Sequence, residues 1–296
     1  MSISRRFKGK EANYLLLLLP LLIFVFVIAI YPLAFSFFIS FFKYRLTDPD
    51  QTKTFVGLAN YITAFKDPQV ITAISNTLVF VAGTVIIEML FGLALALLLA
   101  AETRTMRIVR SFLLMPMAIT PLVVGLIWKS LYNADFGVIS YYLKQLGVDV
   151  GHGPLGEISV AMPAVMLIDI WQWTPLLMVI FLAGLKSLPL EPFDAARVDG
   201  ASRWQSFWYI TLPMLKPALL IGLLMRTVQS FKVFDIIYAT TSGGPGSATT
   251  VLNYHIFTVG MTFFNMGYAA ALANILLVIV AVLSVLYIIV LERQQI

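Results

Sequence analysis

The chain contains six long apolar stretches, and this feature limits its possible folds more than any other. They cover approximately residues 14–40, 73–100, 111–131, 159–184, 217–239 and 267–291. A helix of about 20 apolar residues crosses the roughly 30 Å of hydrocarbon in a bilayer. Because 60% of the 296 residues are hydrophobic and only 12% are charged, one water-soluble core could not bury them all. The sequence therefore predicts an all-α, polytopic membrane protein with about six transmembrane helices.

The apolar stretches are predicted to be helices that stay in the mature protein. Lipid offers no partner for free backbone N–H and C=O groups, and runs such as Leu15 to Leu19 lack the two-residue alternation of barrel strands. The first stretch follows a basic segment, as in a signal peptide, but it is far longer than a signal peptide's apolar region. We therefore expect it to be the first membrane helix.

The basic residues predict the orientation of the chain, because Lys and Arg concentrate in cytoplasmic loops. Most of them fall in the two tails and in the loops after the second and fourth stretches. These are Arg5, Arg6, Lys8, Lys10, Arg104, Arg107, Arg110, Lys186, Arg197, Arg203, Lys216 and Arg293. The opposite side carries Lys43, Arg45, Lys53, Lys66 and Lys144, with Lys129 near a helix end. Both termini are therefore expected in the cytoplasm.

Several chemistries are excluded or not expected. The chain has no cysteine, which excludes disulfides, thiol catalysis and thiolate metal sites. His152 and His255 fall in different predicted outer loops, so no metal site is expected. No G-x-x-x-x-G-K-[ST] phosphate loop is present, and the acidic residues are scattered rather than convergent. We therefore expect a protein that is not an enzyme and binds no cofactor of its own.

The loop at about 187–213 carries the most informative pattern. Glu191 and Pro192 form a good helix start, and Ala195 and Ala196 give a smooth surface that another protein can approach closely. Gly200 is a natural break. A second short helix, ended by Pro213, is expected to present Trp204, Phe207, Trp208 and Ile210. The pattern predicts a helical knob that fits a groove on a partner protein.

This loop resembles the "EAA" loop of bacterial ATP-binding-cassette (ABC) importer permeases. The resemblance rests on Asp194-Ala-Ala, Asp199-Gly-Ala201, Phe207, Ile210 and Leu212-Pro213, with Asp194 where the family name implies Glu. In that family the loop is the coupling helix, which docks on the ATPase subunit. The resemblance therefore implies ATPase coupling for Glu191, Asp194, Ala195, Ala196, Asp199, Gly200, Ala201 and Phe207.

Further motifs resemble the carbohydrate-uptake branch, which includes maltose-type and glycerol-phosphate-type permeases. They are Phe55-Val-Gly-Leu-Ala-Asn-Tyr61, Asn76-Thr-Leu78, Gly243-Gly-Pro245 with Thr249, and Trp171 with Pro175. The resemblance implies a type I importer permease fold, with residues 1–296 as a single transmembrane domain in the bacterial inner membrane. It also implies a second, similar permease as heterodimer partner, two ATPase subunits that carry ATP and Mg, and an extracytoplasmic solute-binding protein. No nucleic-acid partner is expected.

Two polar stripes predict a cavity between the fourth and fifth membrane helices. Asp169, Gln172 and Trp173 recur on one helix face, as do Arg226, Gln229 and Ser230, and polar groups in a membrane face protein or water. The corresponding segments of maltose-type permeases resemble those that contact sugar there, so these six residues are candidates for solute binding. The alternative is a structural network in which Asp169 pairs with Arg226 or Lys232. Lys232 and Asp235 can also form an ion pair with each other.

The solute class stays open at the level of sequence. Gln, Ser and Asp can bind the hydroxyls of a neutral sugar, and an aromatic ring can cover its apolar face. Arg226 and Lys232 could instead attract an anionic solute such as a uronate, sulfonate or phosphate sugar. An ion-coupled secondary transporter is the alternative class, but no internal repeat is visible and the cytoplasmic knob would be unexplained.

Overall fold

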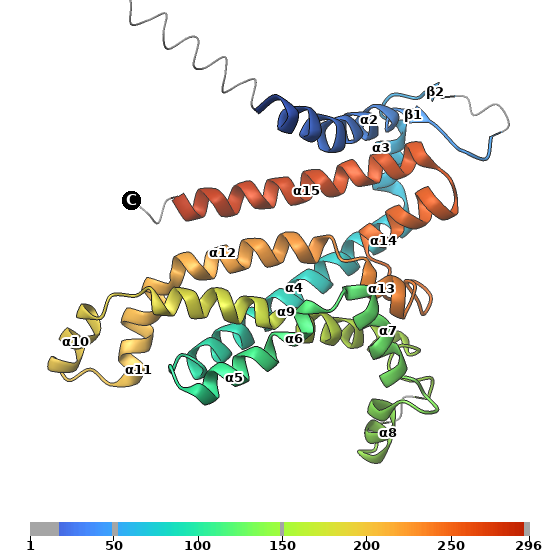
Figure 1. The fold of residues 1–296 in the computed structure, drawn as a ribbon. Coiled ribbons are helices and arrows are strands. Elements are labelled where there is room, and N and C mark those ends of the chain that lie inside the picture. Colours follow the sequence, from blue (N-terminus) through green and yellow to red (C-terminus); the bar gives the residue numbers. More distant parts are fainter. Residues whose placement is uncertain (1–17, 49–52, 149–150, 293–296) are drawn as a thin grey trace, which may run out of the picture. The chain divides into compact units, whose positions relative to one another are not determined.

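The structure is a computed structural model that describes residues 18–48, 53–148 and 151–292 (Figure 1). The chain divides into two compact units, one of residues 1–66 with 256–275 and one of residues 67–255 with 276–296. Five described helices are long and apolar enough to cross a membrane: Leu18–Ile39, Pro68–Leu98, Ile158–Lys186, Arg203–Phe231 and Met266–Val290. They correspond to five of the six predicted stretches, and the all-α fold class is confirmed.

The remaining predicted stretch, the third along the chain at 111–131, is a broken helix. The chain there forms α5 (Arg104–Leu113), α6 (Met115–Ala118) and α7 (Pro121–Leu131). Ile119 and Thr120 are extended, since the residue before a proline is pushed out of the helical region and Pro121 lacks an N–H. A continuous apolar pattern could not show this break.

The fifth predicted stretch, at 217–239, was placed wrongly along the chain. The helix begins at Arg203 with α11 (Arg203–Ser206), continues through the π-helical η2 (Phe207–Thr211) and ends with α12 (Leu212–Phe231). Pro213 does not end a short helix, as predicted, but lies inside this continuous one. The wider π-turn directly before it accommodates the missing N–H and the bulk of the ring.

The first unit joins three segments around a tyrosine. It contains η1 (Phe26–Ile30), α2 (Tyr31–Ile39), β1 (Phe42–Lys43) paired antiparallel with β2 (Thr54–Phe55), α3 (Ala59–Lys66), η3 (Thr258–Thr262) and the first part of α15 (Met266–Glu292). Tyr61 Oη lies 2.7 Å from Ser40 Oγ and accepts a 3.2 Å hydrogen bond from Asn274 Nδ2. Asn60 Nδ2 donates to the carbonyl of Ser40 at 2.7 Å. The Asn60-Tyr61 motif thus holds this unit together.

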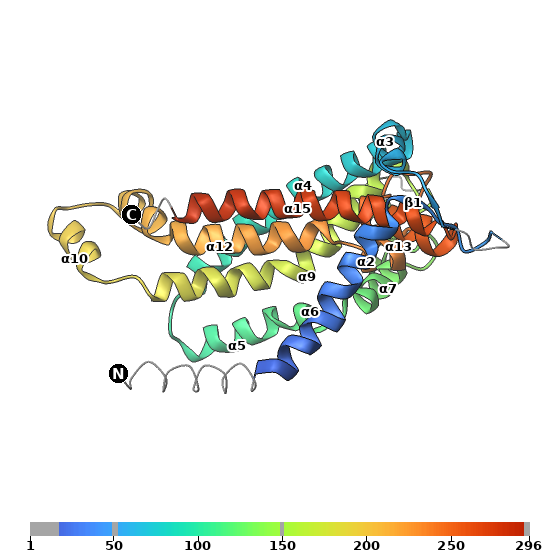
Figure 2. The ribbon, with the colours of Figure 1, turned by 90° about the horizontal axis from the view of Figure 1, so that it is seen from above.

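The second unit is built on three helices that run side by side (Figures 1 and 2). These are α4 (Pro68–Leu98), α9 (Ile158–Lys186) and α12. A Cβ on Gly92 of α4 would lie 2.7 Å from Leu177 Cβ of α9, so glycine is needed for the two backbones to approach. The unit also contains α8 (Val138–Gln145), α10 (Glu191–Val198) and α13 (Asp235–Thr240), and the residues of α14 (Leu252–Phe257) are divided between the two units after His255.

The segment between α13 and α14 is fastened to α4 by the Asn76-Thr77 motif. Asn76 Nδ2 donates to the carbonyls of Ser247 and Thr250 at 2.9 and 3.0 Å. Thr77 Oγ1 accepts from the N–H of Leu252 at 2.8 Å. A turn at Gly243-Gly-Pro-Gly246 lies within this fastened segment. Asn76 and Thr77 therefore fix the shape of the connection between α13 and α14.

Candidate functional site

An open cavity of about 290 Å³ lies in the second unit, where α12 ends. Asp169 and Trp173 reach it from α9, and Arg226 and Gln229 reach it from α12. The break between α12 and α13 closes one side, and the remaining lining residues are Pro121, Lys232, Val233, Phe234, Asp235 and Ile236. The two stripes predicted from the sequence therefore meet at one cavity, although only four of their six polar residues line it.

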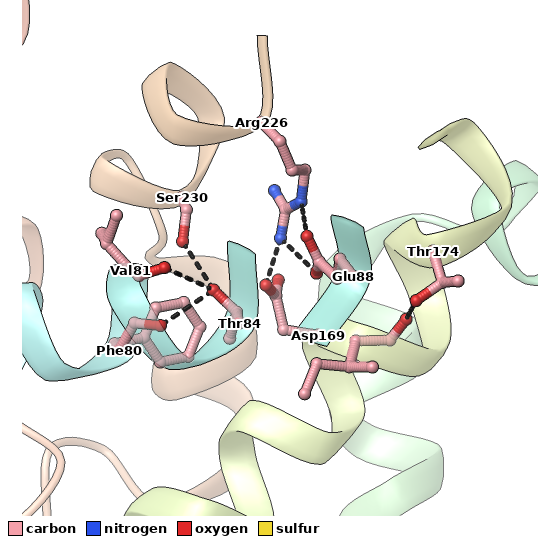
Figure 3. A network of polar contacts seen from close by, with 9 residues as sticks. Phe80, Val81, Thr84, Glu88, Asp169, Thr174, Arg226 and Ser230 are labelled. Atoms are coloured by element: carbon pink, nitrogen blue, oxygen red, sulfur yellow. Dashed lines mark hydrogen bonds and ion pairs between the residues drawn. The ribbon is translucent and has the colours of Figure 1, made fainter. Parts of the chain in front are cut away.

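Arg226 sits at the centre of a buried ion network beside this cavity (Figure 3). Its Nε donates to Glu88 Oε2 at 2.5 Å, its Nη2 donates to Glu88 Oε1 at 2.8 Å, and Nη2 also donates to Asp169 Oδ2. Glu88 is 0% exposed, Arg226 1% and Asp169 3%. Paired, charge-assisted hydrogen bonds of this kind are the strong ones, and here they join α4, α9 and α12. The Asp169–Arg226 pair that the sequence left open is formed.

Trp173 links the ion network to the cavity. The Arg226 Cζ atom lies 5.6 Å from the Trp173 ring centroid, within the range of a cation–π interaction. Gln229 lies one turn along α12 from Arg226 and lines the cavity, and its Oε1 is buried without a hydrogen-bond partner among the described residues. An aromatic ring can bind the apolar face of a polar solute, and an unpaired amide oxygen that turns toward the cavity can accept from a hydroxyl.

Gln172 and Ser230 face away from the cavity and join helices. Gln172 Nε2 donates to the carbonyl of Ile119 at 2.9 Å. That carbonyl lies at the break between α6 and α7, where no helical N–H can reach it, so Gln172 satisfies the broken end. Ser230 Oγ lies 3.0 Å from Thr84 Oγ1 of α4, as Figure 3 shows. Both side chains are buried contacts between helices.

Lys232 and Asp235 line the cavity but do not pair with each other. In the parts of the chain that the structure describes, neither side chain has an ion-pair partner within 4.0 Å. Both are exposed. The structure thus differs from the expected mutual ion pair, because α12 ends at Phe231 and the i, i+3 helical spacing does not apply across the break.

The predicted coupling loop contains one short helix and a defined cap. α10 runs from Glu191 to Val198, and it ends in a Schellman motif. The N–H of Ala201 donates to Ala196 O at 2.8 Å and that of Gly200 donates to Arg197 O at 3.1 Å, with Gly200 at φ +78°. The predicted break at Gly200 is confirmed. Asp194, exposed on α10, forms a surface ion pair with Arg197 at 3.1 Å.

The loops after α4 and after α9 lie at the same end of the unit. Lys186, the last residue of α9, donates to Glu102 Oε1, and this hydrogen bond lowers the pKa of the Glu102 carboxyl. The connection from α4 to α5 therefore lies beside the coupling loop, as the positive-residue pattern predicts for two loops on one side of a membrane.

Residues 88–295 match the family described as binding-protein-dependent transport system inner membrane component. The chain belongs to this family. It is therefore a component of a transport system in the inner membrane, and the five apolar helices make it a multi-pass protein. The alternative of an ion-coupled secondary transporter is not favoured.

Relatives of this permease match it along most of its length. A trehalose/maltose transport system permease protein, MalF, of Thermococcus litoralis is 35% identical over 96% of this chain and 94% of its own. A probable ABC transporter permease protein, y4oQ, of Sinorhizobium fredii is 38% identical over 86% of this chain and 81% of its own. A sulfoquinovosyl glycerol transport system permease protein, SmoG, of Agrobacterium fabrum is 33% identical, with coverages of 94% and 90%. Such relatives are transport subunits rather than enzymes.

A solved structure has the same fold as this permease. The crystal structure of a bacterial ABC transporter involved in the import of the acidic polysaccharide alginate matches with a TM-score of 0.83. The match covers 98% of this chain and 99% of that one at 23% identity. The type I importer permease fold is thus shown for the chain.

The sequence reasoning missed Glu88 in this permease. It is a lone carboxylate in the apolar run of α4, and an ionisable residue inside a membrane segment is by itself a reason to expect a partner on another helix. That signal was present in the sequence, but neither its partner nor its place beside the cavity could be read from α4 alone.

Proposed function

We propose that this chain is the permease subunit of an ABC importer that moves a sugar or sugar derivative into the cytoplasm. The observation that carries the proposal is the cavity at the end of α12, which is lined by Trp173 from α9 and Gln229 from α12. Relatives named for the transport of trehalose/maltose and of trehalose support the same class. Trp173 would cover the apolar face of a sugar ring, and Gln229 would accept a hydrogen bond from a hydroxyl.

The charges around the cavity favour a neutral solute over an anionic one. Arg226 is engaged by Glu88 and Asp169, so its guanidinium is not free for a phosphate or carboxylate. Lys232 shares the cavity lining with Asp235, a charge of opposite sign. An anionic solute would therefore find no unopposed positive charge at this site. Arg226 and Asp169 would then shape the cavity rather than bind solute, as would Gln172 and Ser230.

An importer driven by ATP would need partner chains beside this one. This chain has no phosphate loop, so two separate ATPase subunits would bind ATP and Mg. A second, similar permease would complete the pathway, and an extracytoplasmic binding protein would deliver the solute. The whole chain would act as one transmembrane domain with both termini in the cytoplasm, as the distribution of Lys and Arg favours.

The loop at 187–213 would transmit ATPase closure to the membrane helices. A nucleotide shifts a conformational balance only through contacts that differ between two states, and α10 offers an exposed surface for such contacts. α11 and η2 continue without interruption into α12, which lines the cavity. Movement of the docked loop would thus act directly on the helix that carries Gln229. Glu191, Asp194, Ala195, Ala196, Asp199, Gly200, Ala201 and Phe207 are the proposed coupling residues.

Uptake by the reconstituted importer tests the solute proposal. Gln229→Ala and Trp173→Ala should lower uptake of radiolabelled trehalose or maltose about three- to tenfold, the worth of about one hydrogen bond of 0.5–1.5 kcal/mol. Trp171→Ala is the matched control, because Trp171 lies on the same helix and does not line the cavity. Its ring packs against Trp128, with the two ring centroids 5.6 Å apart. Normal uptake in both cavity variants, with sugar as a substrate, would assign the cavity a structural role. Uptake of glycerol phosphate but of neither sugar would contradict the proposed solute class.

A further inference from the structure

A second surface of interest lies on α5, away from the solute cavity. The helix begins at Thr103, whose Oγ1 accepts a 3.2 Å hydrogen bond from the N–H of Met106. Met106 and Leu113 pack against a core that α4 and α9 form with Leu99, Leu177 and Phe181. This inner face fixes the rotation of α5, so the opposite face carries Arg104, Arg107, Ile108 and Phe112 outward, and all four are exposed.

The two outward arginines form no direct ion pair among the described residues, although Glu102 lies near enough to Arg107 to interact with its charge. Arg110 is used inside the protein, where its Nε donates to Leu99 O at 3.0 Å and its Nη2 to Ala101 O at 2.8 Å, closing the end of α4. The nearby Glu102 is engaged by Lys186. Within the described ranges, Arg104 and Arg107 have no ion-pair partner within 4.0 Å. Their positive charge is therefore available to an external anion.

The apolar half of the same face follows the arginines along the helix axis. Arg104, Ile108 and Phe112 are spaced i, i+4, i+8 and therefore lie in one line. Ile108 is 51% exposed, Phe112 63% and Met115, just beyond the helix, 56%. At a rise of 1.5 Å per residue, the arginine pair and Phe112 are separated by about 10 Å along the axis. That distance is similar to the depth from the headgroups to the upper acyl chains of one leaflet, about 5–10 Å.

We propose that this face of α5 binds an anionic phospholipid of the leaflet beside the coupling loop. The order of groups along α5, first cationic and then apolar, matches the order of a phospholipid, first phosphate and then acyl chain. Arg104 and Arg107 hold the headgroup, and Ile108 and Phe112 contact the chain. The placement beside the coupling loop follows from the Glu102–Lys186 contact rather than from the solute cavity, so the proposal stands whichever solute is carried.

The bound lipid can be measured on the assembled transporter. The full-length chain, co-expressed with its partner subunits and immobilised in detergent, is titrated with radiolabelled phosphatidylglycerol and, separately, phosphatidylcholine. We expect tighter retention of phosphatidylglycerol and loss of that preference at high salt. Arg104→Gln with Arg107→Gln should weaken phosphatidylglycerol binding about thirtyfold, from about 1 kcal/mol per arginine near the lipid surface. Phe112→Ser should weaken both lipids, since it removes chain contact.

Two control variants separate this site from general charge effects and from folding. Lys66→Gln with Lys129→Gln also removes two positive charges, from exposed lysines outside α5, and should leave the lipid preference unchanged. Arg104→Lys with Arg107→Lys keeps the charge and should retain binding even if the glutamine pair assembles poorly. Equal retention of the two lipids by the native complex would overturn the proposal. So would a glutamine pair that keeps its lipid preference, or one that loses a partner subunit while its lipid binding stays native, because the face would then be a protein interface.

Discussion

The buried network around Arg226 gives the sharpest quantitative expectation, because its three members differ in what their removal leaves behind. Arg226→Gln would leave the carboxylates of Glu88 and Asp169 next to each other, both almost fully buried and without a cation. Removing one partner of a buried ion pair costs about 3–5 kcal/mol, since the other charge stays desolvated and unpaired. We expect a loss in that range for Arg226→Gln.

Glu88→Gln should be milder than Arg226→Gln. It removes one negative charge, and the Asp169–Arg226 pair that remains is electrically balanced. The cost is then confined to the two Glu88 hydrogen bonds at 2.5 and 2.8 Å. The glutamine oxygen can still accept one of them, so about 1.5–3 kcal/mol is expected, the worth of one hydrogen bond to a charged group. The triple variant Arg226→Gln, Glu88→Gln, Asp169→Asn carries no buried charge and should recover part of the Arg226→Gln loss.

Thermal unfolding of the purified complex measures these differences. At about 2–4 °C per kcal/mol for a chain of this order of size, Arg226→Gln should lower the midpoint by roughly 6–20 °C. Arg197→Gln is the matched control, because its 3.1 Å ion pair with Asp194 is exposed and such pairs contribute about 0–1 kcal/mol. The reasoning fails if Arg226→Gln has the same unfolding midpoint as the control, or if the triple variant is no more stable than Arg226→Gln. Either result would mean that the carboxylates are hydrated through the cavity.

Three further expectations concern coupling, energy source and topology. Gly200→Val should weaken ATPase co-purification or uncouple hydrolysis from uptake, since φ +78° costs a branched residue about 1–2 kcal/mol in the Schellman cap. Ala196→Trp should have a similar effect because it adds bulk to the docking surface. Gly200→Asn should behave as native, because asparagine tolerates this backbone conformation. Native behaviour of both damaging variants would remove the loop from the coupling pathway. The purified single chain should not hydrolyse ATP, and robust hydrolysis by it alone, beyond an inactive contaminant control, would contradict this. A reporter active only outside the cytoplasm should be silent at Ile296 and active after Gly246; a strong signal at Ile296 would reverse the predicted topology.

The local properties of the chain could be predicted because each depends on residues close together in the sequence. The apolar stretches mark membrane helices, since about 20 residues suffice to cross the hydrocarbon and the pattern needs no information from elsewhere. The break at Gly200 likewise depends on one to three neighbouring residues. The same local reasoning misplaced the start of the fifth helix, because a π-turn next to Pro213 leaves no distinct mark in the sequence.

The site depended on contacts between distant residues, and only the tertiary structure decided it. Arg226 pairs with Glu88 across 138 positions and with Asp169 across 57. Stripe periodicity placed Arg226, Gln229 and Ser230 on one face of α12, but a face of about 100° touches several neighbours. Where α12 packs against α4, Ser230 contacts Thr84 rather than the cavity. Because α12 ends at Phe231, Lys232 and Asp235 line the cavity instead of pairing with each other. The sequence by itself determined which stretches are apolar enough to enter the membrane. The packing of α4, α9 and α12 decided which of their polar groups are neutralised and which face the cavity, because burial and charge pairing are properties of neighbours in space.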